Sequence, residues 1–336
     1  MGIRIAILGA GIMGADHARI IAHELPGVEL HIVCDAAYER AKSVADANGA
    51  ADIATDPLAV INRKDVDAVL IASPDPTHAP LTLACIQAGK PVLCEKPLAP
   101  DADACLEVIT AETKAGKRFV QLGFMRRFDP SYTEMKSTLT AGLLGRAVMM
   151  HNFHRNVEAP PSFTGQMAIT NSAPHEFDIA RFVLETDYTA ITAFQPAGID
   201  ATRTGAPVFM VLETTCGKLV NIEINNNAGY GYDVRGELVG EIGTVQLAAP
   251  VHANFNLNLQ TFQRYPADWR PRFAEAYRLQ NRAWIESIRT GHASSIAANA
   301  WDGYCAARIA QAGVLSLTEQ RRVTLPPVER PGFYHA

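Results

Sequence analysis

The stretch Ile3-Arg4-Ile5-Ala6-Ile7-Leu8-Gly9-Ala10-Gly11-Ile12-Met13-Gly14 decides the fold of the first half of the chain. Its six mostly apolar residues up to Leu8 are typical of a buried parallel strand, and a helical pattern follows to about Glu24. In the G-x-G-x-x-G spacing between them, Gly9 permits a tight turn, Gly11 a close backbone approach and Gly14 close packing of helix on strand. Such a turn binds a pyrophosphate at the helix N-terminus, which predicts a dinucleotide site that includes Ile12 and Met13.

A carboxylate follows the second predicted strand. Val28–Cys34 ends at Asp35, which lies about 20 residues beyond Gly14, where an acidic side chain binds the adenosine ribose hydroxyls. Asp35 is also a candidate N-cap of the next helix, and it can serve both purposes. No basic residue stands directly beside it to receive a 2′-phosphate, although Arg40, one helical turn later, keeps NADP open. The sequence therefore favours NAD over NADP.

Strands and helices alternate through the rest of this half. The sequence predicts strands at 67–72, 91–94 and 119–122 and helices at 76–89 and 101–116. Alternating units of this kind form a doubly wound parallel sheet with right-handed crossovers. We therefore expect an α/β protein with a Rossmann dinucleotide-binding domain over residues 1–122 and a second domain over residues 123–336.

Two further segments leave the carboxyl ends of predicted strands, where open α/β sheets bind ligands. Glu95-Lys96-Pro97 follows one strand, and the proline can fix the direction of Lys96, because X-Pro bonds are where cis peptides occur. The alternative is a surface lysine before a turn proline. The loop from Ser73 and Pro74 to Thr77 and His78 follows another strand. His78 is a candidate contact of the nicotinamide ribose, and a helix-capping role for Thr77 and His78 is equally open.

The second half is less periodic. We expect helices at 128–141 and from Ser172 to about 184, and a strand at 146–152 with His154-Arg155-Asn156 after its end. Residues 160–166 have the composition of a lid or an oligomer contact. A β-rich region at 188–262 predicts an antiparallel sheet, and two helices at 271–289 and 297–317 close the chain. His175, at the start of the 172–184 helix, shares one face with Asp178 and Arg181.

Composition excludes several classes of protein. The chain has 336 residues, of which 48% are hydrophobic and 19% charged, as in a globular protein with a substantial core. A net charge of -5 argues against nucleic acid or an anionic membrane as a partner. The six cysteines form no C-x-x-C pair, and we expect free thiols and no metal site. With neither a signal peptide nor an apolar run long enough to span a membrane, we expect a cytoplasmic protein.

These motifs together resemble those of the Gfo/Idh/MocA oxidoreductases and, within that family, the branch that acts on inositols. In the first half the resemblance rests on Gly9–Gly14, Asp35, Thr77-His78, Cys94-Glu95-Lys96-Pro97 and Gly123–Asp129. In the second half it rests on Gly231–Val234, Val239-Gly240-Glu241, Asp268-Trp269-Arg270 and Ala300–Tyr304. It implies a C-terminal α/β domain with an open, largely antiparallel sheet, and a homodimer or homotetramer formed through that sheet.

The resemblance also implies an activity, the NAD-dependent oxidation of a ring secondary alcohol of a cyclitol, myo-inositol or an isomer. Lys96 would hold the substrate oxygen and His175 would be the general base, since a pKa of about 6.5 suits removal of a hydroxyl proton. Glu95 and Lys96 would also contact the cofactor. The remaining substrate contacts implied by the resemblance are Arg126, His154, Asn156, Asn171, Asp178 and Tyr232.

One position departs from the family pattern. Asn171 stands four residues before His175, where the family's catalytic triad carries Asp. An amide can orient a histidine but cannot bear charge, so His175 should be less basic than with a carboxylate neighbour. Two hypotheses follow: a His–Lys pair acts on a related polyol, or the pocket has changed to a sugar or glycoside. A third hypothesis, a non-catalytic NAD-binding regulator, is disfavoured because Lys96 and His175 are both present.

Overall fold

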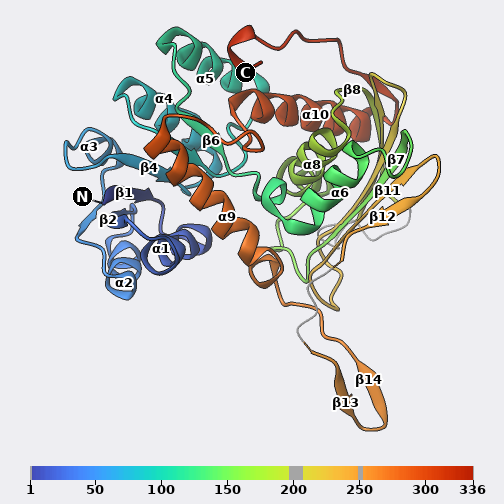
Figure 1. Ribbon diagram of the computed structural model, residues 1–336, viewed down its shortest axis with the longest axis horizontal. Coiled ribbons are helices and arrows are strands. Elements are labelled where there is room, and N and C mark those ends of the chain that lie inside the picture. The colour runs from blue at the N-terminus through green and yellow to red at the C-terminus, as the bar shows by residue number, and fades with distance from the viewer. Residues whose placement is uncertain (1, 197–206, 249–252, 336) are drawn as a thin grey trace. The chain divides into compact units, whose positions relative to one another are not determined.

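The computed structural model describes residues 2–196, 207–248 and 253–335, and it divides into two compact units (Figure 1). Unit 1 comprises Met1–Phe128, Glu275–Ala307 and Glu329–Ala336, and unit 2 comprises Asp129–Ala274 and Arg308–Val328. Each unit therefore contains segments from more than one part of the chain. The boundary expected between residues 122 and 123 stays a prediction.

Unit 1 is built on a six-stranded sheet in the order β3-β2-β1-β4-β5-β6, with every neighbouring pair parallel. Its strands are β1 (Ile3–Leu8), β2 (Val28–Cys34), β3 (Asp52–Ala54), β4 (Ala68–Ile71), β5 (Val92–Cys94) and β6 (Val120–Leu122). Most of their side chains are buried, as expected of a parallel sheet covered on both faces. The predicted doubly wound sheet is confirmed, and the sequence reading had not included the short β3.

Helices connect these strands. They are α1 (Ile12–Glu24), α2 (Tyr38–Asn48), α3 (Pro57–Ile61), α4 (His78–Gln87) and α5 (Ala102–Ala115), with single 3₁₀ turns at Asp75–Thr77, Met125–Phe128 and Gly332–Tyr334. Figure 1 shows α1 and α2 on one side of the sheet and α4 and α5 on the other. The right-handed crossovers that parallel strands require place helices on both faces in this way.

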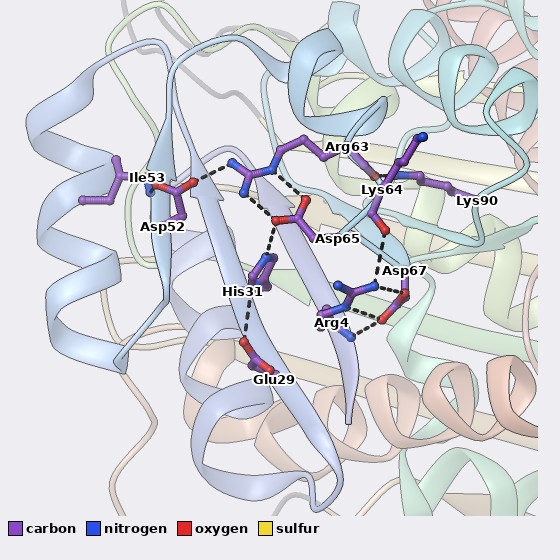
Figure 2. Close-up of polar contacts among 10 residues, drawn as sticks. All are labelled: Arg4, Glu29, His31, Asp52, Ile53, Arg63, Lys64, Asp65, Asp67 and Lys90. Atoms are coloured by element: carbon purple, nitrogen blue, oxygen red, sulfur yellow. Dashed lines mark hydrogen bonds and ion pairs between the residues drawn. The ribbon is translucent and has the colours of Figure 1, made fainter. Parts of the chain in front are cut away.

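Charged side chains form a network of ion pairs and hydrogen bonds at the amino ends of β1, β3 and β4. Figure 2 shows Arg63 between Asp52 and Asp65, and His31 of β2 between Asp65 and Glu29. Nearby, Arg4 at the start of β1 and Asp67 just before β4 form an ion pair at 2.8 Å. Hydrogen bonds from Arg63 and His31 lower the pKa of Asp65. This network holds the loop before β4, at the edge opposite the carboxyl ends of the strands.

Unit 2 contains a seven-stranded mixed sheet in the order β12-β11-β7-β10-β9-β8-β15. All neighbouring pairs are antiparallel except β7 and β10, which run parallel. The strands are β7 (Ala147–Arg155), β8 (Tyr188–Phe194), β9 (Val208–Thr214), β10 (Leu219–Asn225), β11 (Asp233–Gly240), β12 (Thr244–Gln246) and β15 (Val323–Thr324). A separate hairpin pairs β13 (Phe255–Leu257) with β14 (Gln260–Phe262). The expected largely antiparallel sheet is confirmed.

Helices pack on one face of this sheet. Unit 2 contains α6 (Pro130–Thr140), the short α7 (Gly165–Met167), a π-helical turn at Ala168–Ser172 and α8 (Pro174–Leu184). Two longer helices, α9 (Trp269–Thr290) and α10 (Ala300–Glu319), contribute residues to both units. Figure 1 shows α6 and α8 on the same side of the sheet. Alternating burial along β9 and β10 agrees with a sheet covered on one face.

The expected end of the 146–152 strand is wrong. β7 continues to Arg155, because Arg155 pairs with Asn225 of β10 on one side and with Asp233 of β11 on the other. His154 therefore lies within a central strand, where its side chain is buried, and not in a loop after the strand. Local sequence does not reveal such long-range pairing. Asp129 is the N-cap residue of α6 by position, but its carboxylate binds Arg272 at 2.9 Å and makes no capping hydrogen bond.

Candidate active site

The candidate residues of unit 1 gather at one edge of its sheet. Gly9, Asp35, Ser73, Glu95 and Gly123 each follow a strand of the sheet at its carboxyl end. Because all six strands are parallel, these ends lie along the same edge. Open α/β sheets bind their ligands at this edge, outside the carboxyl ends of the strands. The fold therefore places the glycine turn, the acidic residue and the Lys96 segment together.

Two of the three motif glycines are required by close backbone contacts. Gly9 has φ +100°, and a Cβ built on it would lie 2.5 Å from the Ala72 carbonyl. A Cβ on Gly14 would lie 1.8 Å from the carbonyl oxygen of Gly9, so α1 can approach β1 only with glycine there. A Cβ on Gly11, in contrast, would meet nothing within 4 Å. The space in front of Gly11 is open in the way that a closely approaching pyrophosphate requires.

Asp35 lies beside this turn and is ionised. Its carboxylate accepts hydrogen bonds from the backbone N–H groups of Ala10 and Ala37, each at 2.8 Å. Arg40 donates two more, and these are the largest cause that lowers the pKa of Asp35 to about 2. The N-cap of α2 is Ala37, so Asp35 does not cap that helix itself. A buried, ionised carboxylate next to the glycine turn is a suitable acceptor for ribose hydroxyls.

The loop after β4 is tightly hydrogen-bonded. Ser73 and Thr77 share a hydroxyl hydrogen bond of 2.5 Å, and the Thr77 hydroxyl donates to the Pro74 carbonyl at 2.7 Å. His78 is 1% exposed, and its Nδ1 and Nε2 lie 2.6 Å from the Pro97 carbonyl and 2.8 Å from the Ser73 carbonyl. Protein carbonyls thus engage both ring nitrogens of His78.

Lys96 leaves β5 in a fixed segment. The Lys96–Pro97 peptide is cis, and the preceding Glu95 is buried. The carboxylate of Glu95 lies 2.9 Å from Nε2 of His17, a fully buried residue of α1. Arg126, expected to contact substrate, is 1% exposed in the 3₁₀ turn after β6. Beside it, Arg127 forms a buried ion pair with Asp302 at 3.0 Å.

Unit 2 brings three of the expected substrate residues together. The rings of His154 and His175 lie 6.4 Å apart between centroids, and those of His154 and Tyr232 lie 5.9 Å apart. His154 is also paired with Glu176 of α8, whose Oε1 lies 3.2 Å from its Nδ1. All four side chains are buried. This cluster joins β7, α8 and the residue before β11 around two ionisable imidazoles.

The other expected residues of unit 2 lie on the neighbouring segments. Asn156 donates to Oδ1 of Asn226 at 2.7 Å, and the Ser172 hydroxyl donates to the same oxygen at 3.2 Å. Asn171 lies in the π-helical turn, where its Oδ1 accepts from the Thr170 hydroxyl at 2.7 Å. Asp178 is 2% exposed on α8. Asn171 therefore lies in the π-helical turn that precedes α8, Asp178 lies on α8 itself, and Asn156 is linked to Ser172 of the turn through Asn226.

Sequence reasoning missed His17, Glu176 and Asn226. His17 lies one turn after Gly14 on α1, and Glu176 directly follows His175. Their positions next to recognised motif residues were the one feature of the sequence that could have identified them. Their contacts come from segments far apart in sequence, which the local pattern does not reveal. Among the described residues, no cluster of three or more His, Cys, Asp or Glu side chains could hold a metal ion. In the same part of the chain, no helix is long and apolar enough to cross a membrane.

Comparison with known proteins gives consistent matches over the chain. Residues 3–124 match a family model described as an oxidoreductase family with an NAD-binding Rossmann fold, and residues 132–246 match the model of the GFO/IDH/MocA C-terminal domain. The chain is 44% identical over 334 residues to inositol 2-dehydrogenase 4 of Saccharopolyspora erythraea, with 99% of this chain and 98% of that protein covered. It is 40% identical over 332 residues to inositol 2-dehydrogenase of Streptomyces avermitilis, with 98% and 96% covered.

A solved structure gives the same result. The structure of myo-inositol dehydrogenase from Lactobacillus casei in complex with NAD(H) and myo-inositol matches with a TM-score of 0.94. The two sequences are 27% identical, and the match covers 100% of both chains. The similarity therefore extends over both units.

Proposed function

Because the chain belongs to the Gfo/Idh/MocA oxidoreductase family, we propose that it oxidises a ring secondary alcohol of a cyclitol to a ketone, with NAD as the hydride acceptor. The substrate is myo-inositol or one of its isomers. The observation that carries this proposal is the similarity over almost the whole chain to inositol 2-dehydrogenases, at 44% identity in one case. Similarity confined to the nucleotide-binding unit would have left the substrate class open.

The residues of unit 1 fit NAD. The open space at Gly11 suits a pyrophosphate, and the ionised carboxylate of Asp35 suits the two adenosine ribose hydroxyls. Asp35 would repel a 2′-phosphate. The turn residues Gly9, Ile12, Met13 and Gly14 would surround the pyrophosphate. Ser73, Pro74, Thr77, His78, Glu95 and Lys96 belong to the two loops that would face the nicotinamide half.

The protein's own groups act on the hydroxyl. When bound, NAD accepts a hydride from the carbon that bears this hydroxyl. Lys96 would donate a hydrogen bond to the substrate oxygen and stabilise the negative charge that develops on it. His175 would take the hydroxyl proton through its imidazole, so that the alcohol loses one hydride and one proton to become a ketone.

A polyol ring also needs partners for its other hydroxyls. We propose Arg126, His154, Asn156, Asn171, Asp178 and Tyr232 as these partners. An unsatisfied buried hydroxyl costs about 1–3 kcal/mol, so a ring of donors and acceptors decides which stereoisomer binds. The ring contacts of His154 with His175 and Tyr232 support a shared site for two of these side chains and the proposed base, His175.

A second candidate is the oxidation of a sugar or glycoside on the same scaffold. Asn171 favours it, because an amide in place of the family's carboxylate changes both the charge and the hydrogen-bonding pattern four residues before His175. Either substrate needs the same cofactor and the same Lys96, and the two candidates differ in the shape of the polyol that is turned over.

We further propose that the enzyme is a cytoplasmic homodimer or homotetramer. Phe194, Phe209 and Leu219 lie on the sheet face of unit 2 opposite α6 and α8, and among the described residues they are 40–52% exposed. A second copy that packs on this face would cover them. The six cysteines are free thiols, as is usual in a reducing compartment. Light scattering of the purified protein, beside Phe209→Glu, tests the oligomer.

The activity is tested by NADH formation with a panel of inositol isomers, pyranoses and glycosides, with NAD and with NADP. Lys96→Ala is measured beside the wild type, with a loss in kcat of roughly 10²–10⁴ expected and little change in NAD affinity. Turnover of an inositol that depends on Lys96 supports the proposal. Turnover of sugars alone would favour the second candidate, and NAD binding without any turnover would favour a regulator.

A further inference from the structure

The segment Glu95-Lys96-Pro97 is held on the sheet by its backbone. The Glu95 N–H donates to the Ile71 carbonyl of β4 at 2.8 Å, and the Gly123 N–H donates to the Cys94 carbonyl at 2.7 Å. A Cβ on Gly123 would lie 2.9 Å from Oε2 of Glu95, so this carboxylate packs directly against the Gly123 backbone. Backbone contacts thus fix the segment up to Glu95. They leave open what fixes Lys96 and Pro97.

On the Glu95 side, a buried histidine holds the carboxylate. His17 is fully buried, and its Nε2 lies 2.9 Å from Oε1 of Glu95. The side-chain amide of Asn281 donates to Nδ1 of His17 at 2.9 Å, so Nε2 carries the hydrogen and donates it to Glu95. The ring of Tyr277 packs edge-on against His17 at 5.7 Å. The second oxygen of Glu95 accepts from the Lys96 N–H at 3.2 Å, which carries the restraint to Lys96.

On the Pro97 side, a second buried histidine holds the backbone. Nδ1 of His78 lies 2.6 Å from the Pro97 carbonyl and Nε2 lies 2.8 Å from the Ser73 carbonyl. A carbonyl oxygen only accepts, so both ring nitrogens must donate, and the ring must be an imidazolium. Burial opposes this charge, but neighbouring Cys94 and the two carbonyls outweigh it and raise the pKa of His78 to about 10. His78 therefore links the loops after β4 and β5.

We propose that His17 and His78 are positioning residues that fix Lys96 from its two sides. This inference rests on the proposed function, in which Lys96 acts on the substrate oxygen. A lysine side chain has many rotamers, so its ammonium can be placed reproducibly only if the backbone from which it starts does not move. His17 restrains the residue before Lys96 through a carboxylate, and His78 restrains the residue after it through a carbonyl.

The kinetic test compares His17→Ala and His78→Ala with the conservative variants His17→Gln and His78→Gln and with a matched control variant. Loss of either histidine should reduce kcat by roughly 10- to 100-fold, as expected for a small displacement of a reacting group, with the NAD dissociation constant within about threefold. His17→Gln should recover much of the loss, because a glutamine amide can still donate to Glu95. His78→Gln should recover less, because one amide nitrogen does not reach two carbonyls on opposite sides of a ring. The control is His23→Ala, an exposed histidine of the same helix α1, and it should leave kcat unchanged.

A second measurement does not depend on turnover. Acetic anhydride is used to acetylate the lysines, and mass spectrometry compares the rate at Lys96 with that at Lys42, whose side chain is 45% exposed, in each variant. We expect the Lys96-to-Lys42 ratio to change at least about threefold in both alanine variants and to stay constant in His23→Ala. Nitrogen-15 NMR of labelled histidines should show both nitrogens of His78 protonated at neutral pH and only Nε2 of His17 protonated.

The outcomes separate this inference from the proposed function. If the wild type turns over no alcohol, the proposed function fails, while the acetylation ratio still decides whether the histidines fix Lys96. Unchanged kcat and unchanged acetylation in both alanine variants would overturn the inference. So would a loss of NAD affinity that equals the loss of kcat, because the histidines would then serve the cofactor. A neutral His78 in the NMR spectrum would remove its part of the inference.

Discussion

Arg40 donates two hydrogen bonds to Asp35, from Nε to Oδ2 at 2.9 Å and from Nη2 to Oδ1 at 2.6 Å. The sequence left Arg40 open as a candidate for binding a 2′-phosphate. In the structure its charge is balanced by Asp35, while its own side chain remains more than half exposed. The same pair therefore explains two properties: Asp35 stays ionised for the ribose hydroxyls, and Arg40 offers no unbalanced positive charge to a phosphate.

Replacement of Asp35 should change the cofactor preference. Asp35→Ser removes a charged acceptor, which should lower kcat/KM for NAD roughly 10- to 100-fold, since a hydrogen bond to a charged group contributes about 1.5–3 kcal/mol. It also releases Arg40, so kcat/KM for NADP should rise. The double variant with Arg40→Ala should lose that gain. Initial rates with both cofactors measure this, and an unchanged NAD preference in Asp35→Ser would place the ribose elsewhere.

Two glycines of the same motif should respond differently to alanine. Gly14→Ala forces a Cβ against the Gly9 carbonyl and should destabilise the fold by at least about 1–3 kcal/mol. Gly11→Ala has open space and should melt within about a degree of the wild type, yet bind NAD much more weakly, because the methyl group occupies space that a pyrophosphate needs. Thermal melting and NAD titration together measure both effects. Equal destabilisation by the two substitutions would contradict this assignment.

The sequence predicted the first unit well because its signals are local. A strand, three glycines and a helix follow one another in a single stretch of sequence. The structure confirms the steric requirement for glycine at Gly9 and at Gly14. The family resemblance, which rests on motifs in both halves, is confirmed by the matches over residues 3–124 and 132–246. Local signals of this kind do not require knowledge of the tertiary fold.

Long-range contacts are what the sequence could not give. The continuation of β7 to Arg155 depends on two strands that follow much later in the chain. His17 and Glu95 are 78 residues apart, and neither residue type by itself indicates a partner. The π-helical turn at Ala168–Ser172 has no signature in its sequence, Ala-Ile-Thr-Asn-Ser, although such turns are frequent at functional sites.

Cys216 should be the reactive thiol of the chain. It is exposed, whereas the other five cysteines are buried. Partial burial opposes ionisation, but hydrogen bonds with the hydroxyls of Thr186 and Thr214 prevail and lower the pKa of Cys216 to about 7. Because the thiolate is the nucleophile, alkylation by iodoacetamide should rise with pH and reach half its maximum near pH 7. Thr186→Val should move this midpoint to higher pH, and mass spectrometry of alkylated peptides against pH measures it. An unchanged midpoint in Thr186→Val would show that the Thr186 hydroxyl does not lower the pKa of Cys216.

Asn171→Asp tests how the departure from the family pattern affects the base. A carboxylate four residues before His175 would stabilise its imidazolium and raise the pKa of His175. Since His175 must be neutral to take a proton, the acid limb of the kcat/KM profile should move to higher pH in the variant. Below this limb the variant should be slower than the wild type, and above it as fast or faster, because a more basic imidazole accepts the proton more readily. Gln166→Glu adds the same charge at an exposed position of unit 2 and should leave the profile in place. A profile of Asn171→Asp that coincides with that of the wild type on every alcohol would show that position 171 does not act on His175.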